Sequence, residues 1–265
     1  MKLLGQLRKM NAEAQNPVAY FLNLDKNSYL LNPHIGKPMG LKWTGTITCI
    51  ECGRKTRKSY DQGYCFVCSR DLPQNAMCSF RPELCVHEKG NEADREFWRT
   101  HCNIDHFVYL SLTSGVKVGI TRHTNIPDRW IDQGAIRGLI IARVPQRILS
   151  GQIEVALAKH FADKTNWRKM LTNDVEDEDL VEWRNKLRTY IPEEAQEYFI
   201  ASNSETNLNF PVLQYPKKVK SLNLDKTPSY KGVLKGIKGQ YFIFEDNTVF
   251  NVRGSEGYYV SLTIA

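Results

Sequence analysis

The stretch HFVYLSLTSGVKVGI, residues 106–120, has the pattern of a β-hairpin and indicates the fold more directly than any other segment. Apolar residues alternate on both sides of Thr113-Ser114-Gly115, a three-residue turn with glycine last. Folding about this turn gives the pairs Leu112–Val116, Leu110–Val118 and Val108–Ile120. All six apolar side chains then lie on one face, so the register is self-consistent.

The opposite face of the hairpin carries polar groups. The same register sets Tyr109 opposite Gly119, where no side chain shields the phenol ring or its hydroxyl. Lys117 lies on this face, one pair nearer the turn. The hairpin is therefore expected to present a phenol and an ammonium group on its second face.

Helices are predicted after the hairpin. Pro127 and Asp128 suit the first turn of a helix that contains Arg129. A second helix is predicted from about Gln146 to Phe161, with Glu154 at the border of its apolar stripe. Thr165 and Asn166 are expected to open a third, short helix over residues 166–171.

All seven cysteines lie between residues 49 and 102, and four of them form two CxxC pairs. Cys49 and Cys52 are followed, after twelve residues, by Cys65 and Cys68. A two-residue gap lets both thiolates of a pair bind one Zn²⁺, with sulfur at about 2.3 Å. We predict a closed, structural zinc site of the zinc-ribbon or treble-clef type; the alternative is four unrelated buried cysteines.

A second cluster of metal-binding residue types follows the first. Cys78, Cys85, His87 and Cys102 would make a second closed zinc site, with His101 competing with Cys102 for the fourth position. The irregular spacing leaves open the alternative that Cys78 and Cys85 are simply buried. We therefore expect one or two structural zinc ions.

Composition bounds the remaining possibilities. The chain has 265 residues, 42% hydrophobic and 25% charged, which excludes disorder on composition. The formal net charge of +7 permits a polyanion partner without demonstrating one. No apolar run is long enough to cross a bilayer, and the first ten residues do not form a secretory signal. We therefore expect a cytoplasmic protein, in a reducing compartment where clustered cysteines bind metal.

The flanking regions have strand character at both ends. We expect an N-terminal β segment (1–45), a zinc-binding module (46–105), a core (106–173), a helix and linker (174–205) and a C-terminal β module (206–265). The helix is predicted over 174–200, with the acidic run 174–179 in its solvated first turn. The two β segments are expected to pack as one unit. The C-terminal module is rich in lysine, at positions 217, 218, 220, 226, 231, 235 and 238. With tyrosines between them, these lysines indicate either a nucleic-acid contact or a solvated surface.

The core resembles the GIY-YIG nuclease superfamily over residues 106–171, about a quarter of the chain. The residues that carry the resemblance, in the family's order, are Phe107-Val-Tyr109, Lys117-Val-Gly119, Arg129, Glu154 and Asn166. Two residues depart from the family pattern, because Lys117 stands where a second tyrosine is usual and Phe107 where glycine is frequent. The upstream cysteines and the motif GQYFIF (239–244) are also similar to a bacterial zinc-binding family of unknown function with such a core.

The resemblance implies a catalytic site. Glu154 would hold Mg²⁺ or Mn²⁺, and Arg129 would pair with the scissile phosphate. Tyr109 would take a proton from the attacking water, with Lys117 or the metal lowering its pKa, and Asn166 would orient the site. Each residue also has an ordinary structural interpretation, such as a strand aromatic for Tyr109, a surface charge for Arg129 or Glu154, and a helix N-cap for Asn166.

The sequence therefore predicts an α+β protein: a zinc-ribbon or treble-clef-like module, then a small GIY-YIG-like α/β core, flanked by N- and C-terminal antiparallel β segments. The function we expect is a metal-dependent endonuclease that hydrolyses phosphodiesters in DNA or RNA and contains structural zinc. Two alternatives are a non-catalytic, zinc-containing nucleic-acid-binding protein and a protein-interaction scaffold. Nucleic acid is the expected partner, and no membrane association is expected.

Overall fold

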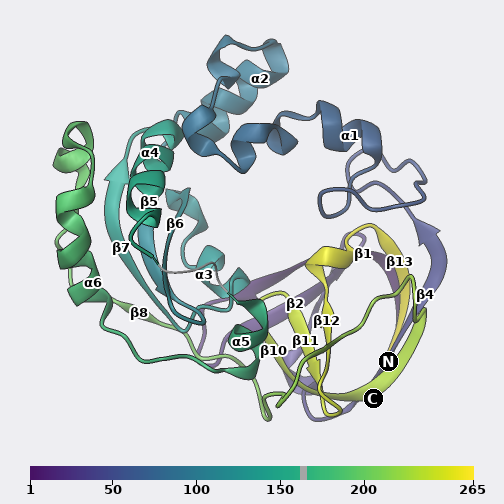
Figure 1. Ribbon diagram of the computed structural model, residues 1–265. Coiled ribbons are helices and arrows are strands. Elements are labelled where there is room, and N and C mark those ends of the chain that lie inside the picture. Colours follow the sequence, from purple (N-terminus) through teal and green to yellow (C-terminus); the bar gives the residue numbers. More distant parts are fainter. Residues whose placement is uncertain (162–165) are drawn as a thin grey trace.

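A computed structural model describes residues 1–161 and 166–265 of the protein. Thr165, which was expected to open a helix, lies outside the described residues. The fold is α+β, as predicted, with two mainly antiparallel sheets and a cysteine-rich region (Figure 1). The described residues contain no helix that is both long and apolar enough to cross a membrane.

The larger sheet has nine strands and joins both ends of the chain. Its strands are β1 (Lys2–Glu13), β2 (Ala19–Leu24), β3 (Asn27–Leu30), β4 (Pro38–Ile47), β9 (Lys220–Ser221), β10 (Ser229–Lys238), β11 (Tyr241–Phe244), β12 (Thr248–Asn251) and β13 (Tyr258–Ile264). Their order is β3-β2-β1-β13-β4-β10-β11-β12-β9. Every pair is antiparallel except β12 with β9.

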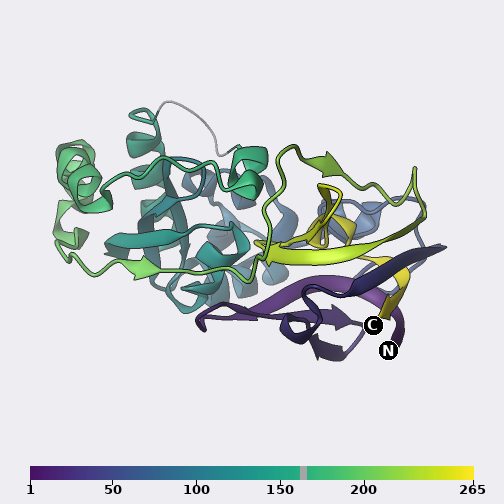
Figure 2. The same ribbon diagram turned by 90° about the horizontal axis from the view of Figure 1, so that it is seen from below.

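The two terminal β segments form one unit, which confirms their expected association. The last strand, β13, lies between β1 and β4, with Val260 paired to Gly5 on one side and to Trp43 on the other (Figure 2). Buried side chains from both segments, such as Leu7 and Phe250, belong to one apolar cluster. Burial of this shared apolar surface stabilises the association of the two ends.

The smaller sheet contains the predicted hairpin. Its strands are β5 (His106–Leu112), β6 (Val116–Arg122), β7 (Arg137–Val144) and β8 (Thr206–Asn207), in the order β6-β5-β7-β8. The pairs Leu112–Val116 and Tyr109–Gly119 confirm the predicted register. Strand β7 was not predicted, because the sequence after the hairpin was expected to form helices and their connecting loops. Its run RGLIIARV is apolar enough for a central strand, which here pairs with β5 and β8.

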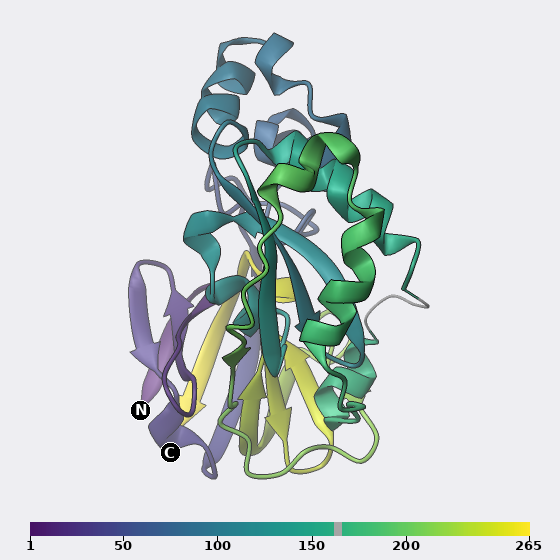
Figure 3. The same cartoon turned by 90° about the vertical axis from the view of Figure 1, so that its left-hand side faces the viewer.

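Helices cover one face of the smaller sheet (Figure 3). The helices after the hairpin are α3 (Asp128–Asp132), α4 (Arg147–Ala158), α5 (Trp167–Thr172) and α6 (Leu180–Leu187). Ile153 of α4 and Leu180 of α6 are buried in one cluster with the sheet residue Leu139. The prediction of a helix over 174–200 is wrong in extent. Asp179 is the N-cap of α6, and Pro192 lies beyond its end among 3-10 turns (Arg188–Tyr190 and Glu193–Tyr198).

The cysteine-rich region is built of short helical pieces and continues directly from β4. It contains α1 (Phe66–Asp71) and α2 (Glu92–Phe97), four 3-10 turns (Pro73–Asn75, Met77–Ser79, Pro82–Leu84 and His87–Lys89) and a π-helical turn (Trp98–Cys102). The other 3-10 turns are Asn32–His34, His123–Asn125 and Arg253–Ser255. Such short pieces bury little apolar surface of their own, which is typical of a module held together by metal.

Candidate functional site

The first cysteine cluster has the geometry of a four-sulfur metal site. The sulfurs of Cys49, Cys52, Cys65 and Cys68 all lie within 4.8 Å of one another. The Sγ atoms of Cys52 and Cys65 are 3.8 Å apart. A tetrahedron with Zn–S bonds of about 2.3 Å has edges of about 3.8 Å, so the four thiolates fit one zinc ion.

The backbone around this cluster explains its compactness. Gly53 and Gly63 have φ of 70° and 118°, which let the chain turn sharply after the first pair and before the second. The amide of Ile50 donates to the carbonyl of Gly63 at 2.9 Å and so joins the two turns. The cluster can therefore hold a metal ion such as zinc.

The residues predicted to form the second cluster lie in two close pairs, and among the described residues only the first cluster has its ligand atoms all within 4.8 Å of one another. Cys78 Sγ lies 3.0 Å from His87 Nε2, and Cys85 Sγ lies 3.6 Å from Cys102 Sγ. His87 Nδ1 lies 3.0 Å from Asp94 Oδ1. A carboxylate on the second ring nitrogen is the usual support of a zinc-bound histidine.

His101 does not compete with Cys102 in this geometry. Its ring stacks on Phe97, with centroids 4.3 Å apart and an interplanar angle of 10°. Its Nδ1 lies 2.7 Å from Thr100 Oγ1. Cys102, and not His101, lies against Cys85.

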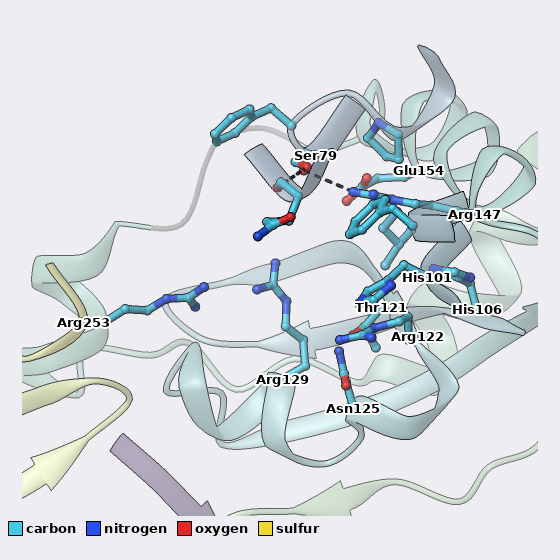
Figure 4. Close-up of a pocket in the computed structure, with 15 residues that line it drawn as sticks. Ser79, His101, His106, Thr121, Arg122, Asn125, Arg129, Arg147, Glu154 and Arg253 are labelled. Atoms are coloured by element: carbon cyan, nitrogen blue, oxygen red, sulfur yellow. Dashed lines mark hydrogen bonds between the residues drawn. The ribbon is translucent and has the colours of Figure 1, made fainter. Parts of the chain in front are cut away.

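A cleft lies between the second cysteine cluster, the hairpin and the larger sheet. Its cavity volume is about 630 Å³, and its walls come from residues 74–106, from β6, α3 and α4, and from the 3-10 turn Arg253–Ser255 (Figure 4). Its charged lining residues are Arg122, Arg129, Arg147, Arg253 and Glu154. In Figure 4, Arg129 and Arg253 point into the same space from different walls, and Glu154 lies near Arg147.

The arginines of the cleft have no carboxylate partners among the described residues. Within residues 1–161 and 166–265, none of the four forms an ion pair. Burial and repulsion from Arg147 lower the pKa of Arg122. The Nε of Arg253 is buried with no hydrogen-bond partner among the described residues. Arg147 also contacts the sulfur of Cys102 and the carbonyl of Ser79. A group of guanidinium groups without carboxylate partners is suited to an anion with several oxygens.

Glu154 is half-buried among these cations. Burial raises the pKa of its carboxyl group, while Arg129, Lys117 and Arg147 lower it. Lys117 lies close enough to Arg129 and Glu154 to interact with both charges. Burial, and to a smaller extent repulsion from Arg129, lowers the pKa of Lys117 to about 8. The predicted residues Lys117, Arg129 and Glu154 are therefore neighbours.

Tyr109 belongs to the same group but lies behind the surface of the cleft. Its side chain is fully buried, its hydroxyl donates to Gln133 Oε1 at 3.2 Å, and its ring meets Trp130 edge-on at 5.8 Å. Burial raises the pKa of Tyr109, whereas the adjacent Arg129 guanidinium lowers it. The phenol is thus a neighbour of Arg129 and is not among the residues that line the cleft.

Asn166 is the N-cap of α5. Its side-chain oxygen accepts hydrogen bonds from the amides of Arg168 (3.0 Å) and Lys169 (3.3 Å) at the start of α5. Its own amide donates to Ser114 Oγ in the hairpin turn at 3.0 Å. The N-cap interpretation is confirmed, and Asn166 is not among the cleft residues.

Several cleft residues were not found from the sequence. Arg147 stands seven residues before Glu154, two helical turns along the same face of α4, and this spacing was a usable signal. His106 lines the cleft and is kept neutral at pH 7 because burial lowers its pKa to about 4. Arg253 comes from the far end of the chain, and no local pattern places it here.

The fold and these clusters define a class of protein: an α+β, cysteine-rich chain with a basic cleft between its parts. A family model described as "Protein of unknown function (DUF2797)" matches residues 36–260, and the chain belongs to this family. Neither the curated proteins nor the solved structures include a match to the chain.

Proposed function

We propose that the protein is a metal-dependent phosphodiesterase that acts on nucleic acid, with its catalytic centre at Glu154 and Arg129. The observation that carries the proposal is the composition of the cleft. Glu154 is the one carboxylate among its described lining residues, and Arg129 and Arg147, which lie near it, form no ion pair with a carboxylate of the described chain. One carboxylate with substrate phosphate and water is a usual ligand set for Mg²⁺.

Glu154 and Arg129 have different roles in this proposal. Glu154 would hold Mg²⁺ or Mn²⁺, because a carboxylate oxygen is a hard ligand and no backbone or side-chain donor occupies it in the described structure. The ion would supply activation of the attacking water and neutralise charge on the phosphate. Arg129 would bind two oxygens of the scissile phosphate through its planar fork.

Tyr109 receives a positioning role in this proposal. A phenol that is fully buried and has a raised pKa is poorly suited to accept a proton from water at neutral pH. Its hydroxyl lies beside Arg129 and Gln133, so it orients the guanidinium. Lys117 adds positive charge beneath Glu154 and Arg129.

The zinc ions would have a structural role. Four protein ligands leave no open coordination position for water, so neither cluster is suited to hydrolysis. The second cluster holds the wall of the cleft that faces Glu154. The resemblance of residues 106–171 to GIY-YIG nucleases supports the same assignment, because Arg129 and Glu154 occur in that family's order.

The experiment is a cleavage assay on a panel of substrates. Purified protein is incubated with Mg²⁺ or Mn²⁺ and with single-stranded, duplex and branched DNA and RNA. We expect at least one substrate to be cut by the wild type and by Glu182→Gln, an exposed carboxylate of α6 that pairs with Lys186. Glu154→Gln should not cut it. Equal behaviour of all three proteins on every substrate would refute the proposal.

A second candidate is a non-catalytic nucleic-acid-binding protein, which the burial of Tyr109 favours. The C-terminal lysines at 217, 218, 220, 226 and 231 are exposed and available for phosphates. Two others are not, because Lys238 is buried and Lys235 pairs with Glu245. This candidate predicts salt-dependent binding that survives Glu154→Gln and weakens when the exposed lysines are neutralised.

A further inference from the structure

An exposed aromatic side chain lines the same cleft as the arginines. Phe80 is 73% exposed, the highest value among the large hydrophobic residues of the chain, and it lines the cavity. It lies two residues after Cys78, in the loop that the second cysteine cluster closes. Its ring is therefore open to a ligand that enters the cleft.

Further rings line the same wall. Phe97 and His101, which stack face to face at 4.3 Å, are also lining residues. The cleft is therefore lined by flat rings as well as by guanidinium groups, and Arg147 lies next to the rings through its contact with the carbonyl of Ser79. Rings that stack on bases, together with cations that bind phosphates, are the features by which proteins bind unpaired nucleotides.

The size of the cavity suits a single nucleotide. A volume of about 630 Å³ is in the range of pockets for small molecules. It is large enough for an unpaired base with its sugar and phosphate. A base within a duplex would first have to be extruded, at a cost in stacking and pairing energy.

The aromatic wall is held firmly against the core. Gly151 of α4 packs against the turn Pro82–Leu84 so closely that a Cβ at 151 would lie 2.5 Å from the backbone nitrogen of Glu83. Arg147 of the same helix reaches the carbonyl of Ser79 at 3.4 Å. These contacts flank Phe80 on both sides in the sequence, so its position relative to Glu154 is fixed by α4.

We propose that the cleft binds a single-stranded segment of nucleic acid, with one base stacked on Phe80 and the neighbouring phosphates on Arg129 and Arg253. This inference deepens the proposed function, on which it rests, by naming the substrate class of the same site. It assigns Phe80 as the residue that distinguishes unpaired from paired nucleotides.

The test measures binding separately from cleavage. Glu154→Gln protein, without added divalent metal, is titrated into fluorescein-labelled oligo-dT, oligo-U and a mixed-sequence duplex, each about 12 nucleotides or base pairs long, and anisotropy is recorded. We expect at least one single strand to bind about tenfold or more tightly than the duplex. Adding Phe80→Ala should weaken that binding by roughly 5- to 150-fold, the equivalent of one base–aromatic stack. Phe80→Trp should restore it.

Met77→Ala is the matched control, because Met77 is 69% exposed in the same region and does not line the cleft. It should leave the affinity unchanged, and all variants should retain the same zinc content. Duplex binding as tight as single-strand binding, or an unchanged affinity of Phe80→Ala, would overturn the inference. Absence of cleavage by the wild type would instead count against the proposed function and leave the binding result standing.

Discussion

The hydroxyl of Tyr109 lies directly over Gly119 of the neighbouring strand. A Cβ placed on Gly119 would lie 2.6 Å from the hydroxyl oxygen and 2.7 Å from the ring carbon that carries it. The two residues are paired across β5 and β6, and only a glycine leaves room for the ring to lie flat over the partner strand. This contact fixes the phenol beside Arg129, and through it the guanidinium that faces the cleft.

Replacing Gly119 by alanine is therefore expected to displace Tyr109. We expect Gly119→Ala to lower the free energy of unfolding by about 1–3 kcal/mol, because a buried ring must move. Urea unfolding curves measure this change. Gly115→Ala in the turn of the same hairpin is the control, since nothing lies within 4 Å of its added Cβ. If both variants were equally stable, the close packing of Tyr109 on Gly119 would be disproved.

The hairpin shows what could be predicted from the sequence. Its register follows from the alternation of six apolar residues about one turn, so local pattern was sufficient to pair Tyr109 with Gly119. The same holds for the helix that carries Glu154, whose stripe of Leu149, Ile153 and Leu157 repeats every four residues. Both elements are defined by contacts close together in the chain.

The cleft shows why the rest could not be predicted. Arg253 and Arg129 are separated by more than a hundred residues. They line one cleft because α3 packs on the larger sheet, where Asp132 binds Lys9 and Gln240. The position of Phe80 depends on the docking of the cysteine region on α4, which no local pattern encodes. For Asn166, the sequence allowed both a catalytic role and a helix N-cap. The structure shows the N-cap.

The second cysteine cluster should depend on Asp94 for its metal. Asp94→Asn removes the charge that holds His87 Nδ1 and should weaken zinc retention by roughly 10- to 100-fold. The measurement is zinc content by elemental analysis during competition with a chelator, with two zinc ions expected in the wild type. Glu92→Gln, in the same helix but paired only with Arg95 and Arg99, should behave as wild type. One zinc ion per wild-type chain would contradict the second site.

Gly151 should be needed for docking of the cysteine region. Alanine usually stabilises a helix interior relative to glycine by about 1 kcal/mol. Here the added Cβ would meet the backbone of Pro82 and Glu83, so we expect Gly151→Ala to destabilise the protein by about 1–3 kcal/mol in urea unfolding. The exposed neighbour Gln152→Ala should have little effect. A stabilising Gly151→Ala would show that the two parts are not packed this closely.

Lys238 should make stability depend on pH in a defined direction. It is fully buried, donates to Asn173 Oδ1 at 2.9 Å and lies over the rings of Phe210 and Tyr215. Burial lowers its pKa to about 8. The unfolded chain, with a lysine pKa of about 10.4, therefore binds more protons above pH 8 than the folded chain, so stability rises with pH between these values.

Comparison with a variant isolates this effect. Relative to Lys238→Met, the wild type should gain about 2 kcal/mol of unfolding free energy between pH 7 and pH 10, measured by urea unfolding at both values. Lys231→Met is the control, because Lys231 is an exposed residue of the same strand. A difference between wild type and Lys238→Met that stays constant with pH would contradict the burial of this ammonium group.

The central claim, that Glu154 holds the catalytic metal, is tested most directly by single-turnover cleavage of the best substrate from the panel. The account predicts a Mg²⁺-dependent rate for the wild type and a rate at least about 100-fold lower for Glu154→Gln, because the metal-dependent stabilisation is lost. Equal Mg²⁺-dependent rates for the wild type and Glu154→Gln would contradict it.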